Sequence, residues 1–274
     1  MESTYNVLFT YTSPRSDFQD SVLALQFDRS HVSYAVKNRT DAQLLALGYG
    51  QVKQWNRSTV DAWMETVKPF VAPNQQVEIG HGFSDLSLLP VAGFEETKLQ
   101  ALHQSLYPFA GPSVFKIETL SSWQLYLGYP IPIALYQQLE STFPAARSRH
   151  LLKLQLEAAG QSGTQGKLLV DICIEQFSIL LLKNNRLQLF NSYFYSSPAD
   201  VLYYLLSVCE SQLVSPAEVE LVLTGLLEKD SALYRELWQY FMHVDFRDAH
   251  FGVSDFPYPA HYFTTLNDVL LCVS

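Results

Sequence analysis

Histidine and aspartate residues near the C-terminus include side chains that could bind a metal ion. His243, Asp245, Asp248 and His250 lie within eight residues, and His261 follows. Alternation along a strand would place the first two on one face, whereas the next two fall in a predicted loop. A zinc site needs three or four ligands in tetrahedral geometry, and this spacing matches no defined zinc module. We therefore favour a polar loop after a strand and predict no metal site.

A single acid interrupts an apolar run in the second half of the chain. Asp171 stands in the sequence LLVDICI. It could act as a magnesium ligand, or it could be a strand-end acid whose oxygens accept hydrogen bonds from backbone donors. Acids are rarely buried without a partner, so we favour the second interpretation. Motifs of the common catalytic classes are missing: the chain has no GxSxG, no P-loop and no HExxH.

Aromatic residues concentrate on a predicted strand and the helix that follows it. They are Tyr193, Phe194, Tyr195, Tyr203 and Tyr204. Tyrosine is enriched at the centres of protein interfaces, so these side chains could bind a partner protein. The competing interpretation places them in the core between sheet and helix, where aromatic residues are common. We favour the core position for these aromatic residues, and the partner surface is the alternative hypothesis.

Composition limits the class of protein further. The 274 residues carry a net charge of −9, and 48% are apolar against 16% charged. A disordered chain would be poorer in apolar residues, and a protein that reads a nucleic-acid backbone would be basic. Cys173, Cys209 and Cys272 lie in apolar contexts and form no CxxC pair, and no segment has the length of a membrane span. We expect a cytoplasmic protein that does not bind nucleic acid.

A weak internal repeat organises the chain. Val22–Asn38 and Leu168–Asn184 each read as strand, short polar turn and strand, and aligning their Lys-Asn ends gives an offset of 146 residues. A third strand follows each hairpin, over Gln43–Tyr49 and Leu187–Tyr195. Tight turns of this kind join antiparallel neighbours. The repeat predicts two lobes of one α/β class, each with a mixed sheet, that face each other across a cleft.

Caps and periodicity predict the elements that position these residues. In the second half, Ser197-Pro198 should begin a helix, Glu218–Thr224 should be a central parallel strand, and His243–Phe246 should be another strand. The remaining predicted helices are Thr59–Phe70 with Ser58 as its cap, Phe94–Leu106, Ile131–Phe143, Arg147–Ala159 and Ser231–Met242. The remaining predicted strands are Gln76–Gly82, Asp85–Leu89, Ser113–Leu120 and Trp123–Leu127.

The stretch GQSGTQGK is the best linker candidate, because it has three glycines and no apolar anchor. We place a linker at 160–167, between a first lobe at 1–159 and a second lobe at 168–274. An insertion subdomain of α+β type is expected within the first lobe, at about 75–143.

Several phrases of the chain resemble a known family, the Bacteroidota domain-of-unknown-function family number 3822. They are FSDLSLLP at Phe83–Pro90, YPIPIALYQQLESTFPAA at Tyr129–Ala146, LQLFNSYFYSSPADVLYYLL at Leu187–Leu206, VLTGLLEKDSALYREL at Val222–Leu237 and HYFTTLNDVLLC at His261–Cys272. The duplicated unit is similar to the actin-like (ribonuclease H-like) fold of sugar kinases, of the cell-division protein FtsA and most closely of the pilus-assembly protein PilM. The resemblance implies two actin-like lobes with an insertion in the first.

The same resemblance implies where a nucleotide would bind. ATP-binding members carry Asp-x-Gly on a strand and turn in each half, and here the matches are Gln26-Phe27-Asp28 and Asp171-Ile172-Cys173. The adenosine loop ends in Gly-Gly, where this chain has Gly225-Leu226. Because all three elements lack an expected glycine, the resemblance implies a degenerate site at Asp28, Asp171 and Gly225.

From these departures we expect a non-catalytic protein without a cofactor that acts through a protein partner or through self-association. Relatives of the pilus-assembly branch bind peptide segments of other proteins, which the resemblance extends to this chain as an expectation. The alternative is an ATPase that binds ATP and magnesium through Asp28 and Asp171.

Overall fold

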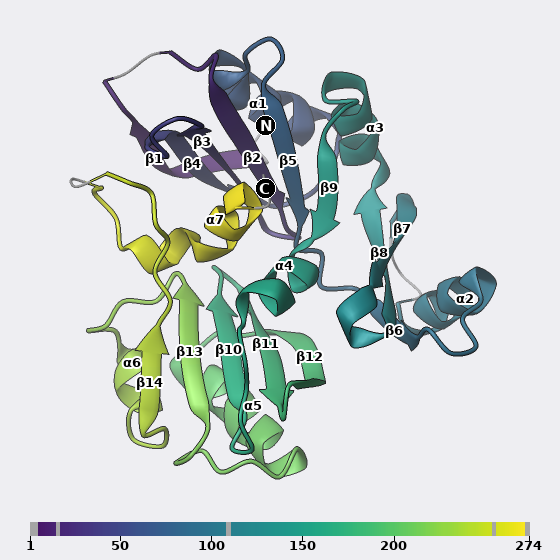
Figure 1. The fold of residues 1–274 in the computed structure, drawn as a ribbon, viewed down its shortest axis with the longest axis vertical. Helices are drawn as coiled ribbons and strands as arrows, with labels where there is room; N and C mark the ends of the chain where they lie inside the picture. Colours follow the sequence, from purple (N-terminus) through teal and green to yellow (C-terminus); the bar gives the residue numbers. More distant parts are fainter. Residues whose placement is uncertain (1–4, 15–16, 108–110, 254–255, 272–274) are drawn as a thin grey trace. The chain divides into compact units, whose positions relative to one another are not determined.

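The computed structural model describes residues 5–14, 17–107, 111–253 and 256–271, and it divides into two compact units. Unit 1 comprises residues 1–155, 251–254 and 266–274, and unit 2 comprises residues 156–250 and 255–265. The elements of both units are labelled in Figure 1.

Unit 1 is built on a six-stranded sheet. Its strands, in spatial order, are β1 (Tyr5–Thr12), β4 (Leu44–Val52), β3 (His31–Asn38), β2 (Ser21–Phe27), β5 (Gln76–His81) and β9 (Arg147–His150). The helices assigned to this unit are α1 (Arg57–Val67), α2 (Glu96–Leu106), α3 (Ile133–Thr142), most of α4 (Leu151–Ala158) and most of α7 (Thr264–Leu271). A second, three-stranded sheet has the order β6 (Ser87–Pro90), β8 (Leu125–Pro132) and β7 (Ser113–Leu120).

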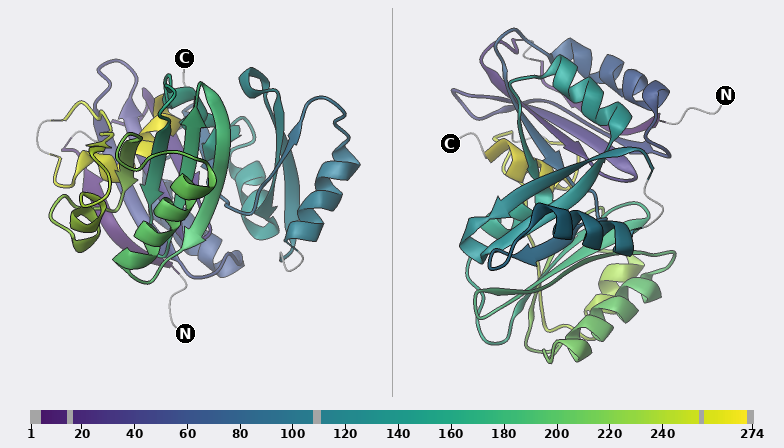
Figure 2. Two further views of the ribbon diagram at one scale, coloured as in Figure 1. Left: turned by 90° about the horizontal axis from the view of Figure 1, so that it is seen from below. Right: turned by 90° about the vertical axis from the view of Figure 1, so that its right-hand side faces the viewer.

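Unit 2 is built on a five-stranded sheet. In spatial order the strands are β12 (Arg186–Phe194), β11 (Gln176–Lys183), β10 (Lys167–Ile172), β13 (Glu220–Gly225) and β14 (His243–Phe246). The helices α5 (Pro198–Ser211) and α6 (Ala232–Leu237) cover one face, as Figure 2 shows for α5. Apolar side chains from both helices and from the strands form one buried cluster between the layers. This burial of one sheet face against helices is the main stabilising contribution to unit 2.

The two large sheets repeat one topology, which confirms the predicted duplication. The order β4-β3-β2-β5-β9 corresponds to β12-β11-β10-β13-β14, with antiparallel pairs first and parallel pairs after them in both sheets. The pairing register also fixes the offset between the hairpins. Asp28 donates to the His31 carbonyl as Cys173 donates to the Gln176 carbonyl, so equivalent positions differ by 145 residues. The offset of 146 that the Lys-Asn ends suggested is therefore wrong by one.

Local signals placed most elements correctly. Ser197 caps α5 in a capping box with Asp200, and Pro198 occupies the first turn as predicted. Ser231 caps α6, although that helix ends at Leu237 rather than Met242. Helix α1 begins two residues earlier than predicted, because the side chain of Asn56 rather than Ser58 caps it and accepts the Thr59 N–H.

The predicted helix over Arg147–Ala159 is wrong in its first part. Residues Arg147–His150 form β9, which pairs with β5 in parallel, and α4 begins only at Leu151. Strand β1, which the repeat pattern did not indicate, pairs with β4 along seven register positions. Both strands form because they pair with a neighbouring strand at an edge of the sheet. Such pairing leaves little signal in the local sequence.

The ranges predicted for the insertion and the linker contain the following elements. The range of about 75–143 begins with β5 and ends with α3; β5 is a strand of the six-stranded sheet, whereas β6, β7 and β8 form the separate small sheet. The range 160–167 is irregular up to the start of β10, and its Ser162 bonds to Asn185 within unit 2.

Candidate functional site

The turn between β2 and β3 holds the first predicted nucleotide residue. Asp28 is 7% exposed, and its carboxylate accepts a hydrogen bond from the backbone N–H of Arg29, next to it in the chain. Its carbonyl accepts a hydrogen bond from the Trp55 indole at 2.8 Å. Its other carboxylate oxygen packs against Gly82, where an added Cβ would lie 2.7 Å away. Asp28 is thus held on three sides by unit 1 itself.

The turn between β10 and β11 is the equivalent place in unit 2. Asp171, on β10, accepts a hydrogen bond from the Thr224 hydroxyl at 2.7 Å, and the Cys173 thiol lies 3.9 Å from its second oxygen. Cys173 itself is buried and stands where unit 1 has Asp28. The two candidate acids therefore do not occupy equivalent positions: Asp171 corresponds to Gln26, as the motif alignment of the two triplets indicated.

Gly225 ends β13 beside the last residue of β10. Its φ of +83° lies in the left-handed region, and an added Cβ would stand 2.1 Å from the Ile172 carbonyl oxygen. The next residue, Leu226, donates its N–H to that same oxygen at 2.6 Å. Packing between two strands of unit 2 thus requires glycine here whether or not a ligand binds.

The four tyrosines differ in their surroundings. Tyr193 and Tyr204 stack on each other with ring centroids 4.2 Å apart and pack against the core of unit 2. Tyr195 donates its hydroxyl hydrogen to the Cys173 carbonyl at 2.7 Å. Burial raises the pKa of Tyr195, and the nearby Cys173 adds to the rise. Tyr203 alone of the four is largely exposed, at 67%.

The histidine-rich segment near the C-terminus brings two of its members together. The His261 ring is buried, with Nε2 at 2.7 Å from the Leu227 carbonyl oxygen and Nδ1 at 3.5 Å from an Asp248 carboxylate oxygen. His243 and Asp245 are exposed on β14, on one face of the strand as predicted. The two other cysteine positions also match expectation in part: Cys209 is buried, and Cys272 lies outside the described residues.

Buried histidines in unit 1 were not singled out by sequence. His31, the last residue of the Asp28 turn, is 1% exposed and stacks on Tyr49 with ring centroids 5.0 Å apart. Burial lowers the pKa of His31 to about 3. Its Nε2 lies 3.3 Å from the Gln26 amide nitrogen, so the ring can accept that hydrogen bond when it is neutral. One feature of the sequence could have indicated that His31 is buried: in the segment FDRSHVSY, this histidine stands at the start of an apolar strand.

A second buried polar group joins the small sheet of unit 1 to the large one. Glu118 on β7 accepts hydrogen bonds from the Tyr129 hydroxyl at 2.5 Å and from the His150 backbone N–H at 2.7 Å. Burial raises the pKa of Glu118, and these two hydrogen bonds oppose the rise. Burial lowers the pKa of His150 to about 4.

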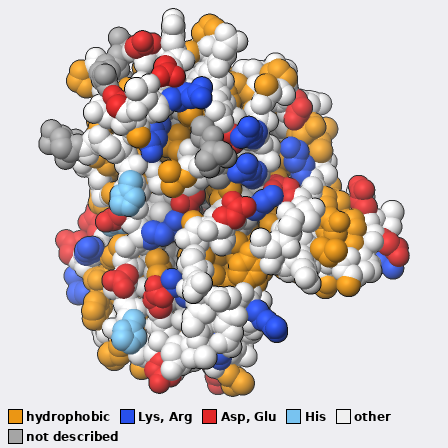
Figure 3. All heavy atoms as spheres, in the orientation of Figure 1, with side chains coloured by type: hydrophobic (Ala, Val, Ile, Leu, Met, Phe, Trp, Pro, Cys, Tyr) orange, Lys and Arg blue, Asp and Glu red, His pale blue; other side chains and the backbone are white. Residues whose placement is uncertain are grey.

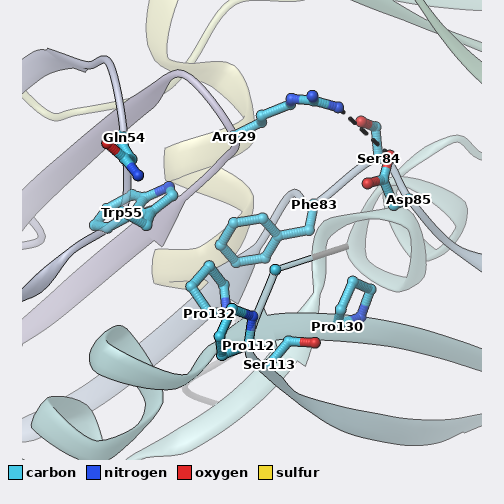
Figure 4. Close-up of a pocket in the computed structure, with 11 residues that line it drawn as sticks. Arg29, Gln54, Trp55, Phe83, Ser84, Asp85, Pro112, Ser113, Pro130 and Pro132 are labelled. Atoms are coloured by element: carbon cyan, nitrogen blue, oxygen red, sulfur yellow. Dashed lines mark ion pairs between the residues drawn. The ribbon is translucent and has the colours of Figure 1, made fainter. Parts of the chain in front are cut away.

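A pocket in unit 1 lies beside the turn that holds Asp28 and Arg29. Its volume is about 320 Å³, within the range of ligand pockets. It is lined by Arg29, Gln54, Trp55, Phe83, Ser84, Asp85, Gly111, Pro112, Ser113, Pro130 and Pro132. Figure 4 shows Arg29 and Asp85 on one side, the prolines on the other and the rings of Trp55 and Phe83 between them.

The sequence explains how the pocket wall forms. Pro130 and Pro132 belong to β8, and proline cannot donate to a strand ladder. They lie beyond Gly128, where the pairing of β8 with β6 ends, so only β7 pairs with this part of the strand. The Arg29 guanidinium and the Asp85 carboxylate form an ion pair at 3.7 Å, with 55% and 35% of the two side chains exposed. The pocket therefore combines apolar walls with one polar rim.

Comparisons with known proteins were consistent with one family and one fold. The family described as "Protein of unknown function (DUF3822)" matches residues 16–244. A Bacteroides thetaiotaomicron protein with an actin-like ATPase fold and unknown function is similar at 18% identity and a TM-score of 0.72, over 84% of this chain and 91% of that one. A chain of the PilM–PilN type IV pilus biogenesis complex is similar at 12% identity and a TM-score of 0.60, over 92% and 98%. No curated protein matches.

These likenesses show that the two repeated units have the actin-like fold, as expected from the resemblance. Acidic and basic side chains are interspersed on the face drawn in Figure 3 rather than gathered by sign. Within the part of the chain that the structure describes, no helix has both the length and the apolarity to cross a bilayer.

Proposed function

The chain belongs to the DUF3822 family, and from this premise we propose that it is a non-catalytic, actin-like protein that binds an extended segment of another protein. The pocket beside Arg29 is the binding site in this proposal, and the cytoplasm is where it acts. The observation that carries the proposal is the pairing of two features of unit 1: a phosphate-loop turn occupied by its own side chains, and an apolar pocket next to it.

The turns are poorly suited to phosphate. Phosphate loops present several backbone N–H groups to the ligand, and glycine allows close approach. In this chain the Arg29 N–H donates to the Asp28 carboxylate, and the Cys173 N–H donates to the Gln176 carbonyl. A negatively charged Asp28 in the first turn would also repel a phosphate unless a cation lay between them. These contacts support a degenerate site.

The pocket suits a peptide better. Trp55 and Phe83 offer flat apolar rings, and the three prolines add a rigid wall that needs no ordering when a ligand binds. At the rim, Arg29 and Asp85 can each exchange their long ion pair for a hydrogen bond to a peptide group or a charged side chain. The structural likeness to a chain of the PilM–PilN type IV pilus biogenesis complex adds support, because that structure is a complex of two proteins.

The test is selection of peptides from a displayed random library on the intact chain, followed by binding measurements. We expect enriched peptides with an apolar side chain, and we expect Ser113→Trp, which fills the pocket, to weaken their binding at least about tenfold. Ser121→Trp is the matched control, because Ser121 is exposed and does not line the pocket. Equal binding to both variants, or no enrichment on the wild-type chain, would contradict the proposal.

The alternative is binding of ATP and magnesium through Asp28 and Asp171. It is favoured by the presence of one acid at or near the turn of each of two equivalent hairpins, although the two positions differ by two residues. A ligand at a hundred times its dissociation constant stabilises a protein by about 2.7 kcal/mol. An increase in melting temperature with Mg-ATP that Asp171→Ala abolishes would establish this alternative and overturn the degenerate site; no change would remove it.

A further inference from the structure

A second hollow of unit 1 adjoins the pocket beside Arg29. Its volume is about 460 Å³. It is lined by Gln100, His103, Gln104, Tyr107, Ser113, Phe115 and Pro130, and we call it the amide pocket. Ser113 and Pro130 line both hollows, so these two residues form the boundary between them. Figure 4 shows both residues on the side of the first pocket that is opposite Arg29.

One face of α2 supplies the polar groups of the amide pocket. Its residues Gln100, His103, Gln104 and Tyr107 have the spacing i, i+3, i+4 and i+7, which places them on one side of the helix. Gln100 and Gln104 are exposed, and neither side-chain amide has a hydrogen-bond partner among the described residues. Residues four apart on a helix have Cβ atoms about 5–6 Å from each other, so one polar group can contact both amides.

His103 is the buried polar residue of this lining. It is 4% exposed, and its ring contacts the rings of Tyr107 and Phe115 at centroid distances of 4.9 and 4.8 Å. Its Nδ1 lies 3.3 Å from the Ser87 hydroxyl oxygen, whereas Nε2 has no hydrogen-bond partner among the described residues. Buried polar atoms without a partner are uncommon in folded proteins. This nitrogen is a second indication, independent of the two glutamines, that the hollow takes a polar ligand.

The amide pocket suits an uncharged ligand. None of the described residues that line it is an acid, a lysine or an arginine. Burial lowers the pKa of His103, so its ring is mostly neutral at pH 7, and the charge of nearby Asp85 opposes that fall only in part. Burial of an unpaired charge costs more free energy than burial of a neutral group that forms hydrogen bonds. A carboxamide is the best match, because it donates and accepts as the glutamines do.

We propose that the segment bound in the first pocket continues across Ser113 and Pro130 and places an asparagine or glutamine side chain in the amide pocket. This inference rests on the proposed function, since it extends the same bound segment. Two adjoining spheres with the volumes of these hollows have centres about 9 Å apart, which an extended chain covers in about three residues. The recognised sequence is thus an apolar residue and an amide residue about three positions apart.

The shared boundary is what favours one segment over two separate ligands. A second anchor on the same chain binds intramolecularly, so it adds affinity without a second loss of translational freedom. Pro130 is also rigid, which lowers the entropy lost when a chain is ordered across it. A small amide compound that bound in the second hollow alone would need no apolar residue beside it. The two cases therefore differ in whether both anchors of one peptide matter.

Peptides selected from the displayed library on the intact chain are the probes, and fluorescence anisotropy measures their dissociation constants. We expect alanine in place of the peptide's amide residue to raise the dissociation constant about tenfold. Gln100→Ala with Gln104→Ala should weaken binding of the unaltered peptide equally, and the two changes should not add, because they remove one contact. Gln137→Ala with Gln138→Ala is the matched control, since these glutamines of α3 line neither hollow. Alanine is the best helix former, so all four substitutions should leave the helices folded.

The outcomes separate this inference from the proposed function. Selected peptides that lack an amide residue would overturn the inference and leave the proposed function standing. Equal losses in the two double variants, or losses that add in the peptide and the protein, would do the same. Affinity that is unchanged when the peptide's apolar residue becomes alanine would overturn it in favour of a separate small ligand. Failure to select any peptide would overturn both.

Discussion

The Tyr195 hydroxyl donates a hydrogen bond to the Cys173 carbonyl, and this bond joins the residue after β12 to the turn between β10 and β11. The Tyr195 N–H bonds to the Glu175 carbonyl in the same turn. One residue thus closes the turn through both its backbone and its side chain. These two bonds give Tyr195 a structural role in unit 2, whereas the sequence suggested it as part of a partner surface.

Removing only that hydroxyl should destabilise unit 2. We expect Tyr195→Phe to lower the free energy of unfolding by about 1–2 kcal/mol, because the Cys173 carbonyl loses its partner in a partly buried place. Urea denaturation followed by circular dichroism measures the change. Tyr203→Phe is the control and should stay within about 0.5 kcal/mol of the wild type, since Tyr203 is 67% exposed. Equal losses in the two variants would contradict this role of Tyr195.

Gly225 should tolerate no side chain. Gly225→Ala would bring a Cβ to 2.1 Å from the Ile172 carbonyl oxygen at a φ of +83°, so we expect a loss of about 3 kcal/mol or more in stability. Thermal unfolding measures the loss. Gly163→Ala, in the same unit but with nothing within 4 Å of the added Cβ, should have almost no effect. A stable Gly225→Ala variant would mean that β10 and β13 can separate at this point.

Stability should depend on pH through His31. Its pKa of about 3 in the folded chain lies below the ordinary value of 6.5, so below pH 6.5 the unfolded chain binds a proton that the folded chain does not. The contribution is constant above pH 6.5 and declines as the pH falls toward 3. Between pH 7.5 and pH 5 we expect His31 to account for a loss of about 2 kcal/mol.

His31→Gln provides the comparison, because unit 2 has Gln176 at the equivalent position. Urea denaturation at both pH values should give this variant a smaller difference in unfolding free energy than the wild type. His81 and His150, whose pKa values burial also lowers, should keep part of the slope. An unchanged difference would show that His31 does not titrate as its burial requires.

Glu118 should be important for the contact between the two sheets of unit 1. Glu118→Ala leaves the buried Tyr129 hydroxyl and the His150 N–H without their acceptor, and we expect a loss of about 2–4 kcal/mol. Glu118→Gln keeps an acceptor oxygen and should lose less. Hydrogen exchange of the β7 and β8 amides measures where the loss occurs. If protection falls no more there than in β2 and β3, the role of Glu118 is not local.

The sequence predicted the elements whose signals are local. The capping box at Ser197, the proline after it and the continuous apolar run of β13 each have a physical cause within a few residues. Strand β9 has the sequence RSRH, which has no strand pattern. It is a strand because it pairs with β5, and not because its side chains favour one. The one-residue error in the repeat offset has a similar origin. Lys-Asn stands at the end of both hairpins, but the two dipeptides do not occupy equivalent positions in the strand pairing.

The pocket could not be predicted in the same way. Its wall brings together Arg29 from one turn, Trp55 before α1, Phe83 after β5 and Pro130 on β8. These residues are far apart in sequence, and each is common in turns or strand ends for unrelated reasons. Two of the phrases quoted for the family resemblance contain lining residues: FSDLSLLP has Phe83, Ser84 and Asp85, and YPIPIALYQQLESTFPAA has Pro130 and Pro132.

Two segments that follow the second repeat, around Phe251 and Val269, complete the first unit. The Leu44 N–H of β4 bonds to the Phe251 carbonyl, and Val269 of α7 lies against Gly80 on β5 so closely that an added Cβ would be 2.6 Å from it. During synthesis, the first repeat therefore emerges from the ribosome before residues 251–269 and lacks these contacts until they have followed it. A chain that stops at residue 160 would expose the apolar surface under Val269, so the two repeats cannot be expressed as separate halves without loss. The first repeat can complete its packing only after the second repeat has been synthesised.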